Sequence, residues 1–176
     1  LPLSATLTFS LRAQLPASFS RAQSIEIASA DESFSTTLSL ANGGIRLENA
    51  KVAVATLDPE KAFGSSAFGP LRFRVLLNGV AGDWQPLVSL VRLPRINEVS
   101  CPASVELACR LSGKDLFLID AVSTAANFEP FTPVPDGFPG SVLLLPRPSD
   151  GRLYIKLRDD PSATHSLAVE SMATLP

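Results

Sequence analysis

The chain has 176 residues, 45% of them apolar, and a formal net charge of −2. This length is enough for one large domain or two small ones. No apolar run reaches the roughly 18 residues of a membrane span, and no cluster of Lys and Arg marks a nucleic-acid surface. We therefore expect no transmembrane helix and no nucleic-acid partner.

Apolar and polar residues alternate through the first half of the chain, which is typical of half-buried β-strands. We predict strands near residues 3–11, 25–27, 34–40, 45–47, 52–54, 71–75 and 87–93. The Asn-Gly-Gly at 42–44 suits a tight turn that needs positive φ. One short helical turn follows, because Asp58 can cap it, Pro59 suits its first position and Gly64 suits its end.

The second half continues the alternation. We predict strands near residues 105–111, 116–122, 141–145, 153–157 and 167–172. Residues 127–139 interrupt the pattern with a segment rich in Phe and Pro. Such a segment can cover a sheet edge and block edge-to-edge pairing, or it can dock on the first domain or on a partner. We favour edge cover or packing between domains.

Two internal correspondences suggest two copies of one module. Residues 71–94 align without a gap with residues 153–176, and both segments end in Leu-Pro. Residues 38–50 also resemble residues 109–121. Self-similarity of this kind is typical of repeat arrays, and chance matching in a chain rich in Leu and Pro is the alternative. We interpret the opening Leu1-Pro2 as the end of a preceding copy, or as a boundary drawn at one.

The stretch Leu93, Pro94, Arg95 and Ile96 is the predicted joint between the copies. Proline fixes φ and lacks an N–H, so it ends a strand ladder and stiffens the chain that leaves it. The residue before proline is held extended. We therefore expect domains at residues 1–94 and 95–176, with a short stiff connection and a fixed angle between them.

The spacing of the strands indicates the fold class. About seven short strands in each copy, one every ten residues or so, is the pattern of a β-sandwich. We predict an all-β chain of two consecutive immunoglobulin-like β-sandwich domains. A single large jelly roll that contains all the strands is the alternative.

The two cysteines, Cys101 and Cys109, lie close together in the sequence. Such a pair in a β-rich chain favours a disulfide, and hence an oxidising compartment. The chain must then fold back near residues 102–104. Two free buried thiols in a cytosolic protein are the alternative.

Three short stretches of the second copy carry a family resemblance. They are Pro94-Arg95-Ile96-x-x-Val99, Leu111-Ser112-Gly113-Lys114-Asp115-Leu116 and Ala121-Val122. In these stretches the copy resembles bacterial extracellular immunoglobulin-like repeats of the IPT/TIG kind. The Gly-rich early turn of that family is replaced here by Cys101-Pro102-Ala103-Ser104. The resemblance implies a spacer, adhesive or scaffolding role in a large surface protein.

Few residues are candidates for catalysis or metal binding. His165 is the one histidine, no GxSxG nucleophile motif accompanies it, and we expect it in an exposed loop. Asp159 and Asp160, with Asp150 or Asp136, are a calcium hypothesis. The DxDxDG loop is missing, and turn chemistry also explains these residues. We predict no catalytic residue, no metal and no cofactor.

Trp84 and Phe131 are the candidate ligand contacts, because an exposed aromatic ring can stack on a sugar. Trp84 lies in a loop with Gly82 and Pro86, and Phe131 lies in the segment rich in Phe and Pro. Sugar-binding modules usually align two or three rings, whereas the chain has one Trp and one Tyr. We favour a core or interdomain place for Trp84.

The predicted function is that of a non-enzymatic structural or adhesive tandem module from a larger exported bacterial repeat protein. We expect an extracellular or cell-surface location. The expected partners are neighbouring immunoglobulin-like repeats in the same chain, together with a surface protein or a glycan. The alternative is a carbohydrate- or protein-binding module of an extracellular protein. A hydrolase domain ranks last.

Overall fold

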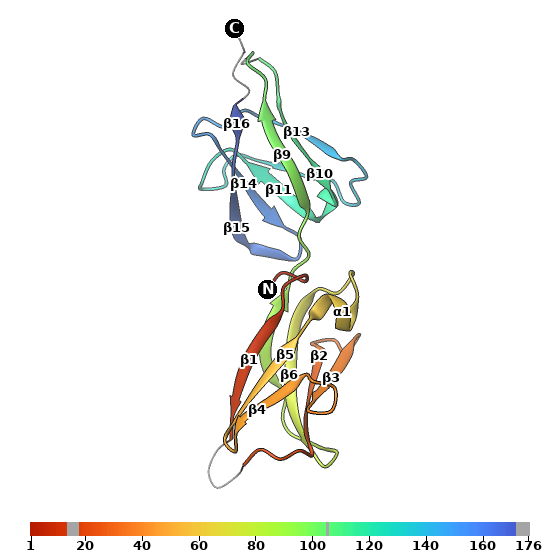
Figure 1. Ribbon diagram of the computed structural model, residues 1–176. Helices are drawn as coiled ribbons and strands as arrows, with labels where there is room; N and C mark the ends of the chain where they lie inside the picture. The colour runs from red at the N-terminus through yellow and green to blue at the C-terminus, as the bar shows by residue number, and fades with distance from the viewer. Residues whose placement is uncertain (14–17, 105, 172–176) are drawn as a thin grey trace. The chain divides into compact units, whose positions relative to one another are not determined.

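The computed structural model describes residues 1–13, 18–104 and 106–171. Strands make up 54% and helices 5%, and the strands form several antiparallel sheets. The chain divides into two compact units, Leu1–Arg92 (unit 1) and Leu93–Pro176 (unit 2), both visible in Figure 1. The prediction of an all-β fold with sandwich architecture is confirmed. The division falls two residues before the boundary predicted after Pro94.

Unit 1 is built from two sheets. Its elements are β1 (Leu7–Arg12), β2 (Gln23–Ser29), β3 (Ser35–Ser39), β4 (Ile45–Asn49), β5 (Val52–Leu57), α1 (Pro59–Phe63), β6 (Gly69–Leu77), β7 (Val80–Ala81) and β8 (Gln85–Leu90). One sheet has the order β1-β5-β4, and the other has the order β3-β2-β6-β7, with β8 also paired to β6. These pairings are antiparallel, as hairpin connections require.

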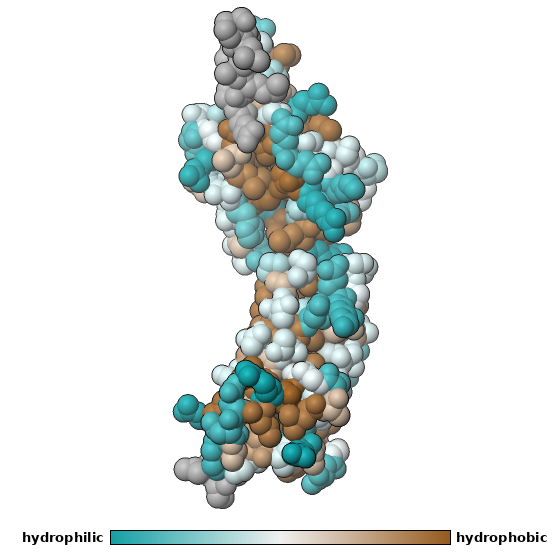
Figure 2. Space-filling model, in the orientation of Figure 1, coloured by the Kyte–Doolittle hydropathy of each residue, from teal (hydrophilic) through white to brown (hydrophobic). Residues whose placement is uncertain are grey.

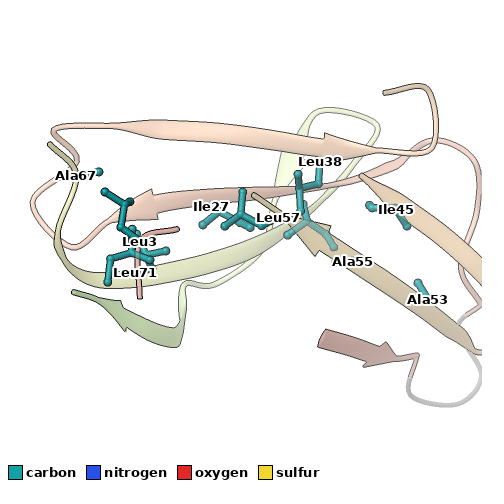
Figure 3. Packing of buried hydrophobic residues seen from close by; sticks show 11 residues of the cluster. Leu3, Ile27, Leu38, Ile45, Ala53, Ala55, Leu57, Ala67 and Leu71 are labelled. Atoms are coloured by element: carbon teal, nitrogen blue, oxygen red, sulfur yellow. The ribbon is translucent and has the colours of Figure 1, made fainter. Parts of the chain in front are cut away.

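The core of unit 1 lies between these sheets, as Figure 3 shows. One sheet contributes Ile25, Ile27 and Leu71, and the other contributes Ala55 and Leu57. Each of these side chains is at most 3% exposed. The alternation in the sequence therefore arises because one face of each strand is removed from water.

The predicted helical turn is confirmed as α1, which connects β5 to β6. The Asp58 side chain accepts a hydrogen bond from the Lys61 N–H, and Pro59 occupies the start of the helix. Gly64 ends it with φ of 85°, and its N–H donates to the Glu60 carbonyl. Local capping chemistry thus fixes this crossover between sheets.

Unit 2 is also built from two sheets. Its elements are β9 (Arg95–Cys101), β10 (Cys109–Lys114), the 3₁₀ helix η1 (Leu116–Leu118), β11 (Ile119–Ser123), β12 (Phe131–Pro133), β13 (Val142–Leu145), β14 (Arg152–Leu157), β15 (Asp160–Ala168) and β16 (Glu170–Ser171). One sheet has the order β13-β10-β9-β16 and the other β12-β11-β14-β15. β16 runs parallel to β9, and the other pairings are antiparallel.

Two predicted strands of unit 2 are wrong in extent. The strand expected at 105–111 begins only at Cys109, and Leu107 lies in the preceding loop with 56% of its surface exposed. The strand expected at 116–122 opens with η1, whose Leu116 and Leu118 are buried. A short apolar run suits a buried helical turn as well as a strand, so periodicity alone does not separate them.

The two units share the order of one sheet. In β3-β2-β6-β8 and in β12-β11-β14-β15, strands that correspond in chain order occupy corresponding places. Leu71 in β6 and Leu153 in β14, which the ungapped alignment pairs, are both buried. Ser29 ends β2 and Ser123 ends β11, and both side chains are 3% exposed. For β6 and β14 the ungapped correspondence therefore joins strands with the same place in the sheet, whereas β8 is aligned mostly beyond the end of β15.

The second internal correspondence is not supported. Residues 38–50 run from β3 to β4, whereas residues 109–121 run from β10 to β11. β3 is an edge strand, and β10 lies between β9 and β13. The place of β11 in unit 2 is held in unit 1 by β2, so the aligned residues are not structural equivalents.

The first residues of the chain belong to unit 1. The Leu1 amino group donates to the Ser89 carbonyl at 2.8 Å, and the Leu3 N–H donates to the Val91 carbonyl at 2.9 Å. Pro2 forms a parallel bridge with Val91. Leu1-Pro2 therefore completes the sheet of its own unit, which corrects its interpretation as the end of a preceding copy. The matching Leu175-Pro176 lies outside the described residues.

Candidate functional site

The predicted joint is divided between a connection and a strand. β8 ends at Leu90 and β9 begins at Arg95, so Leu93 and Pro94 lie in the short connection. Arg95 and Ile96 pair with Lys114 and Gly113 in the sheet of unit 2. Leu93 is 47% exposed. The joint therefore enters the sheet of unit 2 at its third residue, Arg95.

Gly113 fixes the path of the chain at the start of β9. A Cβ atom on Gly113 would lie 2.3 Å from the Arg95 carbonyl oxygen, far inside van der Waals contact. The sheet also has a register shift between Ser112 and Gly113. A residue without a side chain is thus required for this close approach of two backbones.

Cys101 and Cys109 form a disulfide, as predicted. β9 ends at Cys101 and β10 begins at Cys109, and these strands are antiparallel, so the chain folds back within the intervening loop. Both cysteines are buried, at 3% and 1% exposed. Arg147 binds the same loop through its guanidinium, which donates to the Pro102 and Ser104 carbonyls. The disulfide and Arg147 together hold one end of unit 2.

Trp84 lies beside the guanidinium groups of two arginines on β6. The central carbons of Arg72 and Arg74 lie 4.4 Å and 4.3 Å from the centre of the Trp84 ring. Arg74 also binds Glu26 at 2.7 Å, and Arg72 binds Glu32. Trp84 is half-buried. The two guanidinium groups lie over the ring, where a sugar would stack. Trp84 therefore packs against the arginines of β6 and is not free to bind a sugar in this way.

Phe131 begins β12 and is 57% exposed. Its ring stacks on that of buried Phe128, with centres 6.0 Å apart. β12 pairs with β11 and is itself the edge strand of this sheet, so the segment rich in Phe and Pro covers the edge of β11. Trp84 and Phe131 belong to different units.

A pocket of about 210 Å³ lies next to Phe131. Pro130, Phe131 and Thr132 line it from the β12 side. Leu145 and Pro146 line it from the end of β13. The sequence pattern indicates Phe131 as a contact residue but not the residues on the β13 side. The sequence feature that could have indicated the β13 side is the uninterrupted Val-Leu-Leu-Leu of residues 142–145, because a run with no polar residue leaves an apolar side chain on both faces of the strand.

Ser123 also lines this pocket, and its polar atoms are satisfied within the chain. Its hydroxyl donates to the Pro130 carbonyl at 2.7 Å and accepts from the Ala125 N–H at 3.1 Å. The Ser123 hydroxyl is therefore engaged within the chain. Much of the remaining lining is apolar, and it comes from Val122, Phe131, Leu145 and Leu153.

Exposed apolar residues are more frequent in unit 2. Phe68, Leu77 and Val80 are exposed in unit 1, and Leu93, Leu107, Phe117, Phe131 and Leu144 are exposed in unit 2. On the face drawn in Figure 2, apolar surface is bordered by polar residues in each unit. Exposed apolar surface bordered by polar residues is a candidate interaction site where it adjoins a pocket or an unpaired strand edge.

The residues considered for catalysis and metal binding lie in a strand and in turns and bends of unit 2. His165 is exposed on β15, opposite Ile155, so its predicted place in a loop is wrong. Hydrogen bonds from the Arg152 N–H and the Tyr154 hydroxyl lower the pKa of Asp150. Among the described residues, no group of three or more His, Cys, Asp or Glu could hold a metal ion.

The other carboxylates of the calcium hypothesis are also engaged. Asp136 binds Arg158 at 2.5 Å, and Asp160 accepts a hydrogen bond from the Ser162 hydroxyl at 2.8 Å. In unit 1, hydrogen bonds from Ser29 and Ser33 lower the pKa of Asp31 to about 2. The contacts of Asp31 and Asp160 with residues two positions later are the turn chemistry expected of Asp, whereas the Asp136–Arg158 ion pair joins distant parts of the chain.

No model of a known protein family matches the chain, and a search of curated proteins gives no match. In the described part of the chain, no helix is long and apolar enough to cross a membrane.

Reduction of the disulfide is expected to destabilise unit 2 by about 2.5 kcal/mol, because the reduced loop regains entropy in the unfolded chain. Denaturant unfolding of the whole chain, followed with and without reductant, measures the change. The double variant Cys101→Ala/Cys109→Ala is the control, since reductant should not alter it further. An unchanged transition on reduction would refute a stabilising role.

Replacing Arg72 and Arg74 together by Gln is expected to expose Trp84, the one tryptophan in the chain. Each lost cation–π contact should cost about 0.5 to 1 kcal/mol. Trp emission should shift to the red, and quenching by acrylamide should increase. Arg46→Gln, on the exposed face of β4, is the matched control and should leave the emission unchanged.

Proposed function

We propose that this chain is a non-enzymatic pair of immunoglobulin-like modules, with a structural or adhesive role in a larger exported bacterial repeat protein. The observation that carries the proposal is the division into two compact sandwich units, each with its own sheets, joined by a very short connection. Units of this kind act as spacers because each folds around its own core.

The strand order supports the immunoglobulin-like part of the proposal. In unit 1, β1-β5-β4 and β3-β2-β6-β8 match the two sheets of such sandwiches, with a helical turn before β6. The resemblance of unit 2 to IPT/TIG-like repeats is consistent with its β11-β14-β15 core. The modules would join neighbouring repeats in the same chain and present their surfaces to a surface protein or glycan.

The buried disulfide supports export. Disulfides persist in oxidising compartments and are rare in the cytosol of most organisms. Cys101 and Cys109 are also the only cysteines in the chain, so their pairing leaves no thiol for other chemistry. An extracellular or cell-surface location follows as part of the proposal.

Alkylation of intact cells that produce the protein tests export. We expect no labelling of Cys101 or Cys109 before reduction and labelling of both afterwards, measured by mass spectrometry of the peptide that contains them. Labelling of both thiols without reductant would contradict an oxidising location.

The stiffness of the joint is tested by the tumbling of the two units. Since Pro94 restricts the connection, amide relaxation should give one shared correlation time for both units. Insertion of Gly-Ser-Gly between Leu93 and Pro94 should shorten the correlation time of each unit. The same insertion in the Asp136–Gly137 turn is the control. Independent tumbling of the unaltered chain would overturn the semi-rigid spacer.

A further inference from the structure

We propose that the free edge of β13, together with the pocket beside Phe131, binds an extended peptide strand of a partner protein. The peptide would carry apolar residues at alternate positions. Its backbone would pair with β13, and one of its apolar side chains would enter the pocket. That the peptide belongs to a partner protein rests on the proposed adhesive role. The binding surface itself is inferred from the strands and the pocket of unit 2.

Unit 1 supplies the template for such a strand. β5 precedes β6 and pairs with β1, just as β13 precedes β14 and pairs with β10, so β5 and β13 occupy the same place. In unit 1 the other side of β5 is paired with β4. In the described part of unit 2, β13 ends its sheet and no strand takes the place of β4.

β4 closes the side of the unit 1 sandwich. Ile45 lies opposite Ala55 and is 7% exposed, and Leu47 lies opposite Ala53 and is half-buried. The residue between them, Arg46, points to solvent. A strand at this place therefore needs apolar residues two apart, which is the pattern assigned to the peptide.

The pocket lies on the corresponding side of unit 2, between the edges of its two sheets. β12 is the edge of one sheet and β13 the edge of the other, and residues from both line the pocket. Its volume of about 210 Å³ is below the roughly 300 Å³ at which small-molecule sites begin. This size suits one apolar side chain.

β13 is short, with four residues, and Pro146 follows it, but within the strand there is no charge, proline or register shift to block pairing. Natural edge strands carry charges, prolines or bulges that prevent the addition of another strand. β4 carries Arg46 and Glu48, and β12 ends in Pro133. β13 consists of Val and Leu alone, and its Leu144 is 66% exposed. An apolar edge strand without charges beside a matching pocket favours recognition by strand addition.

A second copy of this chain fits the site less well. If two β13 strands paired, the inward side chains would be Leu143 and Leu145 of each copy. Both are already buried in their own core, at 8% and 2% exposed. Neither can fill the pocket of the other copy, whereas a free extended peptide can.

The test is a selection of short random peptides displayed on phage against the whole chain. We expect enriched peptides with apolar residues two apart, and slower amide exchange at residues 142–145 when they bind. Thr132→Glu places a carboxylate at the pocket rim and should weaken these peptides by about tenfold or more, because the charge would be buried. Thr132 is exposed, so the variant should fold.

Thr8→Glu is the matched control, since Thr8 is an exposed strand threonine in unit 1. It should leave peptide affinity unchanged. Enrichment of no peptide with this pattern, or equal binding to Thr132→Glu, overturns the proposal. A dimer of the chain that Thr132→Glu dissociates would assign the edge to a second copy and also overturn it. The alkylation and tumbling experiments are independent of each of these outcomes.

Discussion

The structure depends on one constraint, which is that the apolar inner faces of paired sheets must be closed against water on every side. Face-to-face packing closes most of each unit, and edge strands and loops must close the remaining sides. In unit 1 this is done by β4, whose Ile45 is buried. In unit 2 the equivalent side has β12 and a pocket. The peptide site proposed at β13 follows from that difference between the units.

The units also differ in what stabilises them. In unit 1, backbone hydrogen bonds join Leu1 and Leu3 to Ser89 and Val91 at the end of the unit. The guanidinium groups of Arg72 and Arg74 also stack on the Trp84 ring. Unit 2 has a buried disulfide and the Arg147 contacts at one end. A covalent link acts mainly by restricting the unfolded chain. In unit 2 the disulfide joins β9 to β10, the strand that pairs with the edge strand β13, and Cys109 lies directly opposite Leu145 of β13.

Features set by short-range chemistry were predictable. The turn capped by Asp58 and the disulfide between Cys101 and Cys109 depend on a few neighbouring residues, and both were found as expected. The strand predicted at 105–111 was wrong because Leu107 alternates correctly with Cys109 but lies in a loop. At the candidate site, Phe131 was identified from its local composition. Its partner Leu145 was not, because β12 and β13 meet only through the fold.

The sequence by itself determined the all-β class, the short hairpin strands and the disulfide, because period-two burial, turn residues and cysteine spacing all act over a few residues. Only the tertiary structure decided which strands correspond between the units. The strand orders show that β11 of unit 2 is equivalent to β2 of unit 1, so the sequence alignment of residues 109–121 with residues 38–50 was wrong. They also show that β13 lies at the edge of its sheet. Strand order depends on contacts between residues far apart in the chain, and no local pattern encodes which strand will lack a neighbour.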